Sequence, residues 1–407
     1  MFKSGVIVIL GTVFSHTILF IANPMIYNKY GVNSFGHYHF ALTLSNVLVS
    51  ISSLRYNQAI LPSECRLESA KILIISIVLS LIFSIIGIII CFIGFYSFEL
   101  PLLIQFWILV FCFSVYQTCL FYLIRNGKYL QLGLLRFFSN LNFVFLSIYC
   151  LKPYTLETLL RAKIFGFLVC ISGFFINIIN EIKHVNFKSL KVILVKYIHF
   201  PKYTLIGGFC DALAINSCPL MLKMICGSFE YGLFAAAQIC IALPAGIIAG
   251  AVKEIMIKKF NHLKEKNDVQ CIKSIFIKFN IVCLVVFLIA YVIIYYFGVF
   301  TVGMLGYKNA TSIAGILKIL VLAIPFKTMG TIFSPLFPIF GKLKELGQWQ
   351  LTYFIVLLVL FLAGLYFKLE FYKFIYYFTL IEICIYTNFL YKQFEVIQKH
   401  VRHQCNY

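Results

Sequence analysis

Long apolar runs separated by short polar stretches dominate the pattern along the chain. A helix that crosses a bilayer needs about 20 apolar residues, and the chain offers twelve runs of that kind. The predicted spans are 5–27, 38–60, 70–95, 102–124, 129–151, 163–180, 204–226, 231–253, 275–298, 313–337, 351–367 and 373–391. The pattern predicts an all-α polytopic membrane protein.

The composition agrees with a chain that has lipid as its solvent. Of the 407 residues, 62% are hydrophobic and 12% are charged, whereas a soluble chain is about half apolar and about a quarter charged. This balance excludes a soluble enzyme, a disordered chain and a secreted disulfide scaffold. Most of the 14 cysteines fall inside apolar runs and none forms a Cys-x-x-Cys pair. We interpret them as small packing residues and expect no metal site.

The basic residues fix the predicted orientation. Lys and Arg collect in cytoplasmic loops of membrane proteins. With a cytoplasmic N-terminus, the inner segments hold 23 of the 34 Lys and Arg residues and the outer segments hold seven. Both termini are therefore expected in the cytoplasm. The net charge of +20 then reflects topology, and nucleic acid is not an expected partner.

The loops are too short for chemistry outside the membrane. No loop between the predicted spans could hold a soluble domain, and no Gly-rich phosphate loop, zinc-type His/Cys spacing or Ser-His-Asp arrangement stands out. The chain is therefore not expected to be an enzyme or to carry a cofactor.

Two segments match at an offset of 196 residues. KYGVNSFGHYHFAL (29–42) aligns with ICGSFEYGLFAAAQ (225–238), so that Gly31 falls on Gly227. Chance similarity between two short loops is one explanation. The other is a pair of parallel six-helix repeats, a common plan for transporters with a substrate site between the halves.

The repeat sets the predicted domain boundaries. We expect an N-terminal bundle over 1–183, a cytoplasmic linker over 184–203, a C-terminal bundle over 204–391 and a cytoplasmic tail over 392–407.

Ionisable residues inside spans are costly and are functional candidates by default. The deep cations are Arg55, Lys318 and Lys327, and Lys327 follows Pro325 by two residues near mid-span. The deep carboxylates are Asp211 and Glu382. Glu382 is a candidate ion-coupling group, and its alternative is a structural partner for a lysine.

Uncharged polar groups and prolines complete the predicted interior. Gln117, Asn216 and Gln238 are candidate cavity residues, although each also suits a hydrogen bond to a neighbouring helix. The candidate hinges are Pro24, Pro219, Pro244 and Pro325. Together these features predict a mainly cationic, water-filled interior suited to an anionic head group.

Several short motifs carry a family resemblance. They are SFGHY (34–38), SLRYNQAILPS (53–63), FPKY (200–203), SFEYGLFAAAQICIALPAGIIAGAV (228–252), GYKNATSIAGILKIL (306–320) and SPLFPIFGKLKE (334–345). In this order and spacing the chain resembles the polysaccharide-unit flippases, the Wzx-like members of the multidrug/oligosaccharidyl-lipid/polysaccharide exporter superfamily. One residue departs from the pattern, because Asn57 stands where that family usually has an acid.

The resemblance implies a MATE-like fold of two six-helix bundles in the bacterial inner membrane. It also implies that an undecaprenyl-diphosphate-linked sugar repeat unit is moved from the cytoplasmic to the periplasmic leaflet, for O-antigen or another surface polysaccharide. Membrane lipid, a polysaccharide polymerase and a chain-length regulator are the accompanying candidate partners. On this hypothesis Arg55, Lys327 and Lys318 neutralise the diphosphate, and Asp211 or Glu382 binds a coupling proton or Na⁺.

Two other functions are weighed against this one. A multidrug cation antiporter shares the two-bundle plan, but its substrates call for an acidic cavity. A polysaccharide polymerase usually carries a large periplasmic loop, and the outer loops here are short.

Overall fold

The computed structural model describes residues 2–94, 100–183, 188–266 and 268–405, with only the backbone described at some helical positions. Residues 184–187 of the expected linker, 406–407 of the expected tail and 95 of the third expected span lie outside this part. Contacts divide the chain into unit 1 (Met1–Asn216) and unit 2 (Ser217–Tyr407). The division falls within one helix, and the boundaries expected from the repeat remain a prediction.

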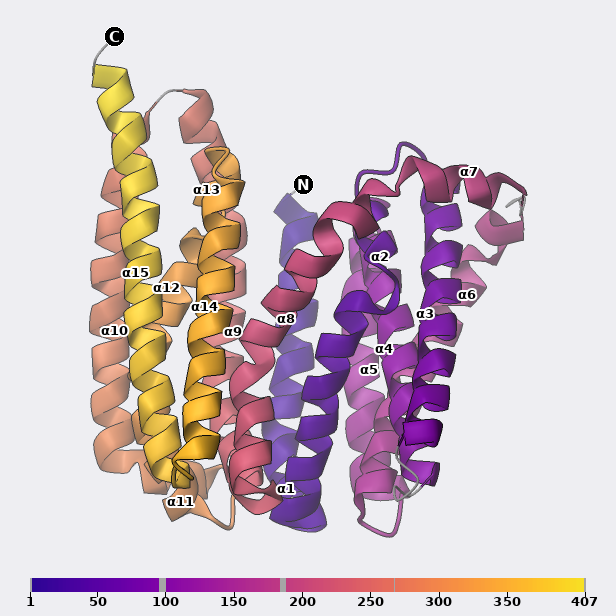
Figure 1. The fold of residues 1–407 in the computed structure, drawn as a ribbon, viewed down its shortest axis with the longest axis horizontal. Helices are drawn as coiled ribbons and strands as arrows, with labels where there is room; N and C mark the ends of the chain where they lie inside the picture. The colour runs from indigo at the N-terminus through magenta and orange to yellow at the C-terminus, as the bar shows by residue number, and fades with distance from the viewer. Residues whose placement is uncertain (1, 95–99, 184–187, 267, 406–407) are drawn as a thin grey trace. The chain divides into compact units, whose positions relative to one another are not determined.

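Unit 1 is built from helices alone in its described part (Figure 1). They are α1 (Phe2–Ser52), α2 (Tyr56–Ala59), α3 (Arg66–Gly94), α4 (Leu100–Arg125), α5 (Tyr129–Phe145) with a π-helical end η1 (Leu146–Cys150), α6 (Leu156–Lys183), α7 (Lys188–Lys196) and most of α8 (His199–Cys226).

Unit 2 is likewise helical in its described part. After the end of α8 it contains α9 (Ser228–Glu265), α10 (Val269–Met304), α11 (Ala310–Leu320), α12 (Ile324–Phe333), α13 (Leu336–Ile339), α14 (Leu343–Tyr366) and α15 (Phe371–Cys405).

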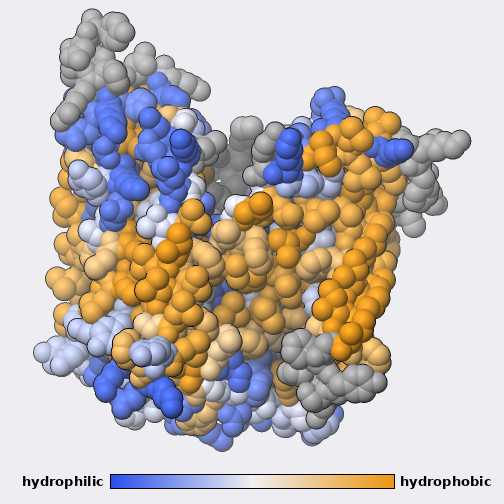
Figure 2. Space-filling model, viewed as in Figure 1, coloured by the Kyte–Doolittle hydropathy of each residue, from blue (hydrophilic) through white to orange (hydrophobic). Residues whose placement is uncertain are grey.

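The membrane-spanning character predicted from the sequence is confirmed. Nine described helices are long and apolar enough to cross a bilayer, and the bent pair α11 and α12 makes a tenth candidate. The first predicted span and most of the second fall on the two legs of α1, which meet at Gly31, and the end of the second span reaches α2. Figure 2 shows apolar side chains over the middle of the helices and polar ones towards their ends, as hydrocarbon and head groups require.

Both glycines of the predicted repeat have the same unusual backbone conformation. Gly31 has φ 78° and ψ 160°, and Gly227 has φ 96° and ψ −171°. Residues with a side chain rarely adopt such positive φ values. Gly31 joins the two legs of α1, and Gly227 joins α8 to α9. Equivalent geometry at aligned positions supports the internal repeat.

Within unit 1, α1 packs closely on α5, and α4 packs on α3 and α6. A Cβ atom added to Gly11 would lie 2.7 Å from Gly133 Cα, so the α1 and α5 backbones meet there. Ser114 of α4 lies within 2.7 Å of the hydroxyls of Ser52 and Ser80, which links α1, α3 and α4. Hydroxyl bridges of this kind hold helices together where lipid gives no hydrophobic driving force.

The short helix α7 lies across the end of α3 (Figure 1). Lys196 Nζ lies 2.9 Å from Glu64 Oε1 and 2.6 Å from Glu68 Oε1. These hydrogen bonds raise the pKa of Lys196. The Tyr56 hydroxyl also donates to the Leu194 carbonyl at 2.9 Å. The described part of the segment expected to be a linker therefore contains a helix that is fixed to unit 1.

Three predicted hinge residues lie inside long helices. Pro24 is buried in α1, Pro219 is buried in α8 and Pro244 is exposed in α9. A proline removes one backbone hydrogen bond and weakens the helix locally. Their role as hinges remains a prediction.

Candidate functional site

Lys327 and Glu382, to which the sequence analysis gave separate tasks, form one ion pair in unit 2. Lys327 Nζ lies 2.7 Å from Glu382 Oε1, and the Tyr353 hydroxyl donates to the same oxygen at 3.0 Å. Glu382 is only 4% exposed, and a buried carboxylate needs partners of this kind. The geometry is that of the structural-partner alternative. Roles in substrate or ion binding remain predictions.

A break between two helices determines where Lys327 lies. α11 ends at Leu320, α12 begins at Ile324, and the segment Ala310–Leu320 makes an angle of 53° with the segment Ile324–Ile339. Pro325 occupies the first turn of α12, where its missing N–H costs nothing. The Lys327 amide donates to the Ala323 carbonyl at 3.1 Å. The lysine side chain therefore leaves from the first turn after the break, and the expected hinge at Pro325 coincides with this break.

Aromatic rings line one side of the ion pair. Trp349 stacks on Phe389 with ring centroids 3.8 Å apart, and Tyr353 lies edge-on to Tyr386 at 5.7 Å. Lys327 Nζ lies 6.0 Å from the Tyr386 ring centroid. Such a wall limits water on that side and strengthens the attraction between the two charges.

Arg55 lies at the break between α1 and α2 in unit 1. Leu54 and Arg55 both have positive φ, 50° and 65°. The guanidinium lies against α8, because a Cβ atom added to Gly208 would lie 1.6 Å from its Nη2 atom. Asp211 follows Gly208 by one turn and attracts the Arg55 charge. The structure thus brings together two residues that the sequence assigned to different roles.

Asn57 lies beside this arrangement in α2. It is 5% exposed, and its Oδ1 atom has no hydrogen-bond partner among the described residues. The acid that the resembled family usually has here is therefore replaced by a buried amide. The negative charge that attracts Arg55 is instead supplied by Asp211 of α8.

A second cationic group in unit 1 was not singled out by the sequence analysis. Arg136 of α5 donates to the Thr12 hydroxyl at 2.6 Å. Asn140, one turn later, donates to the Ser15 hydroxyl at 2.7 Å. Lys163 of α6 donates to the Asn140 side-chain oxygen at 3.1 Å. We call these five residues the α1–α5–α6 network.

The two cations of this network are bonded to neutral groups. Lys163 Nζ lies 5.0 Å from the Phe143 ring centroid and 4.9 Å from that of Phe167. His16 and His39 lie close enough to interact electrostatically with Lys163. Each has one buried ring nitrogen without a hydrogen-bond partner among the described residues.

The described carboxylates of unit 1 compensate other cations. Glu64 and Glu68 pair with Lys196, Glu157 pairs with Arg161 at 2.9 Å, and Asp211 attracts Arg55. Among the residues described in this unit, no carboxylate forms an ion pair with Arg136 or Lys163. The network therefore carries net positive charge inside the membrane, where charge is costly unless it meets an anion.

One feature of the sequence points towards this network. Arg136 and Asn140 are four residues apart and share one face of α5. Lys163 is the first residue of the sixth predicted span, 163–180, so its sequence position places it at a helix end. α6 instead begins at Leu156, so Lys163 lies two turns inside the helix. The polar residues in the first two turns of α6, LETLLRAK, conceal this start.

Lys318 occupies a different position from Lys327. It lies on α11 with its Nζ atom 4.8 Å from the ring centroid of Tyr295 on α10. Among the described contacts, none joins Lys318 to the Lys327–Glu382 pair. The two lysines grouped together from the sequence therefore have separate surroundings.

The predicted uncharged cavity residues are half-buried. The Asn216 side chain donates to the Ala212 carbonyl of its own helix at 2.8 Å. Gln117 lies on α4 and Gln238 on α9. Across the described residues, no group of three or more His, Cys, Asp or Glu side chains is placed to hold a metal ion.

Comparison with known proteins gives a likeness of fold. No family model and no curated protein matches the sequence. An inward-facing multidrug resistance MATE family transporter of the MOP superfamily matches at TM-score 0.71 and 13% identity, over 95% of this chain and 96% of that one. Lipid II flippase MurJ, in an inward closed conformation, matches at TM-score 0.71 and 13% identity, over 97% and 91%.

A third match is to a protein whose own binding pocket is described by its polarity. A MOP superfamily transporter from Pyrococcus furiosus, described as having a binding pocket of reverse polarity, matches at TM-score 0.63 and 12% identity, over 98% of this chain and 96% of that one. The matched proteins include both drug and lipid transporters. The chain is an all-helical polytopic membrane protein with the MATE-like fold.

Proposed function

We propose that the chain is an alternating-access transporter that flips an undecaprenyl-diphosphate-linked oligosaccharide repeat unit from the cytoplasmic to the periplasmic leaflet of a bacterial inner membrane. The observation that carries the proposal is the α1–α5–α6 network, in which Arg136 and Lys163 are bonded to neutral groups. The fold shared with drug and lipid transporters supports a transport function.

The sign of this charge favours an anionic cargo. A diphosphate brings oxygen acceptors that charged donors bind strongly where water is scarce. A drug cation placed beside Arg136 and Lys163 would be repelled in the same low-dielectric surroundings. The network thus supports a lipid-linked diphosphate over the multidrug alternative.

The hydrogen bonds of the network prepare it for this task. The Ser15 hydroxyl donates to the Arg136 carbonyl at 2.9 Å and accepts from Asn140. Asn140 in turn orients Lys163. Side chains held in this way lose little freedom when the anion arrives, which favours affinity. In this proposal Arg55 is a further cation for the head group, while the prenyl chain remains in lipid.

The test is a transport assay on matched variants. Lys163→Met and Arg136→Gln each remove a charge while keeping an unbranched stem, and Gln keeps an amide donor on a shorter side chain. Losing one charged hydrogen bond costs about 1.5–3 kcal/mol, so substrate affinity should fall by about 10- to 100-fold. Arg161→Gln, on the same helix but paired with Glu157, is the control and should transport normally.

The readout is surface glycan in a deletion strain that carries each variant, together with the location of lipid-linked single repeat units. The proposal expects cytoplasmic accumulation for Lys163→Met and Arg136→Gln. Periplasmic accumulation would indicate a polymerase. Normal glycan with altered drug or dye sensitivity in the deletion strain would indicate a multidrug exporter.

A further inference from the structure

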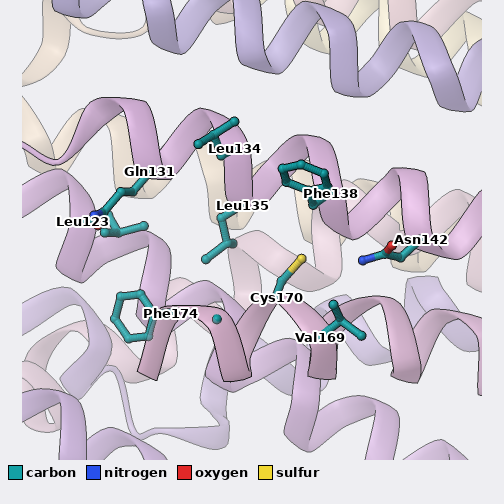
Figure 3. Close-up of a pocket in the computed structure, with 10 residues that line it drawn as sticks. Leu123, Gln131, Leu134, Leu135, Phe138, Asn142, Val169, Cys170 and Phe174 are labelled. Carbon is teal, nitrogen blue, oxygen red and sulfur yellow. The ribbon is translucent and has the colours of Figure 1, made fainter. Parts of the chain in front are cut away.

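A groove of about 360 Å³ lies between α5 and α6. Figure 3 shows side chains from the two helices facing one another across it. Leu134 and Phe138 line it from α5, and Val169 lines it from α6. Its volume is within the range of about 300–1,000 Å³ that small-molecule sites occupy.

The groove exists because the two helices touch at one level and separate at another. A Cβ atom added to Gly166 would lie 2.7 Å from the Ser139 carbonyl oxygen, so the backbones are in contact there. A Cβ atom added to Gly173, two turns further along α6, would meet no described atom within 4 Å. The absence of a side chain at Gly173 therefore leaves the space between α5 and α6 open.

The position and the lining of the groove favour contact with the hydrocarbon of the bilayer. It lies within the candidate spans Tyr129–Cys150 and Leu156–Ile176. Leu134 and Phe138 are each 45% exposed, and Val169 is 54% exposed. An open apolar groove at this depth is in contact with lipid chains, so a hydrocarbon chain is the chemistry that fits it.

Polarity along α5 changes in the same order as along a phospholipid. Lys128 immediately precedes α5, Gln131 follows one turn later and lines the groove, and Leu135 and Phe138 follow on the same face at helical spacing. The loop charges assign the Lys128 end to the cytoplasmic side. An amine at head-group level and an amide just below it are complementary to a phosphate and to an ester carbonyl.

We propose that this groove binds an anionic glycerophospholipid of the cytoplasmic leaflet. One acyl chain lies along Leu134, Phe138 and Val169, and the phosphate lies near Lys128. The inference concerns the outer face of unit 1 and stands independently of the transported cargo.

The experiment blocks the groove by substitution and measures which lipid stays bound to the purified protein. The protein and its variants are purified in mild detergent from membranes containing phosphatidylglycerol and phosphatidylethanolamine, and bound lipid is identified by mass spectrometry. Gly173→Leu places a side chain in the open space. The matched control is Gly207→Leu on α8, where an added Cβ atom also meets no described atom within 4 Å.

The wild type and Gly207→Leu should retain phosphatidylglycerol, and Gly173→Leu should lose it. Val169→Trp, at an exposed position, fills the groove from the lipid side and should have the same effect if Gly173→Leu does not fold. Lys128→Gln should abolish the preference for phosphatidylglycerol over added phosphatidylcholine. Equal retention in Gly173→Leu and wild type, no preference among head groups, or a polyprenyl lipid as the retained species would each overturn the proposal.

Discussion

Removing one partner of the Lys327–Glu382 pair should destabilise unit 2 unequally. The Glu382 side chain is 5% exposed, whereas that of Lys327 is 35% exposed. Lys327→Met leaves a buried carboxylate with the Tyr353 hydroxyl as its remaining partner. Glu382→Gln leaves an ammonium group on a partly exposed side chain that also lies 6.0 Å from the Tyr386 ring centroid. We therefore expect Lys327→Met to be the more harmful change.

The magnitude follows from the cost of an uncompensated buried charge. Breaking a buried ion pair costs about 3–5 kcal/mol. Because Lys327 is partly exposed, we expect a cost at the lower end of this range, about 3 kcal/mol. For a unit of this size that cost corresponds to a Tm lower by about 6–12 °C. Glu382→Gln should cost about half as much, because Gln still accepts from Tyr353. The double variant Lys327→Met/Glu382→Gln should return to within about 1 kcal/mol of the wild type.

The assay is thermal unfolding in detergent, with all five proteins in one lipid and detergent mixture. Tyr353→Phe, which removes one hydroxyl, is the control and should cost about 1 kcal/mol. The reasoning is refuted if Glu382→Gln is at least as harmful as Lys327→Met, or if the costs of the single changes simply add in the double variant. Surface glycan from the stable double variant then tests whether Lys327 also binds the head group.

Three further predictions concern packing. Gly31→Ala and Gly227→Ala should each lower the free energy of unfolding by about 1–2 kcal/mol, because alanine resists positive φ. The control is Gly303→Ala inside α10, where no described atom lies within 4 Å of an added Cβ. It should be neutral or stabilising in thermal unfolding. Gly166→Ala should force α5 and α6 apart and lower Tm, since the added methyl would meet a carbonyl oxygen at 2.7 Å. Ser114→Ala removes a hydroxyl shared by two serines and should cost about 1–3 kcal/mol in the same assay.

Hydropathy predicted the helical, membrane-spanning fold well because it depends on features that the sequence displays directly. A bilayer requires long apolar segments, so the predicted spans fall on described helices. Gly31 and Gly227 were aligned by sequence alone and share a conformation that glycine adopts readily. The start of α6 was misplaced because its first turns are polar, and membrane helices extend beyond the hydrocarbon.

The candidate sites were harder to predict because a polar residue's role depends on which helix face meets which neighbour. Lys327 and Glu382 were each identified by their position well inside a predicted span. Their pairing, however, depends on the bend before α12 and on the packing of α12 against α15. Arg136 and Lys163 were not among the deep cations selected from the sequence, yet the contact of α1 with α5 at Gly11 and Gly133 brings the α1–α5–α6 network together.

A role for Lys327 in head-group binding can be tested through its partner Glu382. A diphosphate approaching Lys327 meets the Glu382 carboxylate at 2.7 Å from the ammonium, so the two anions compete for one cation. Glu382→Gln removes the competing charge and keeps an acceptor for the Tyr353 hydroxyl. If Lys327 contacts the cargo, Glu382→Gln should bind a lipid diphosphate more tightly than the wild type, whereas Tyr353→Phe, which leaves the carboxylate in place, should bind it as the wild type does. Equal affinity in Glu382→Gln and the wild type would exclude this competition, and the head group would then have to bind elsewhere in the chain.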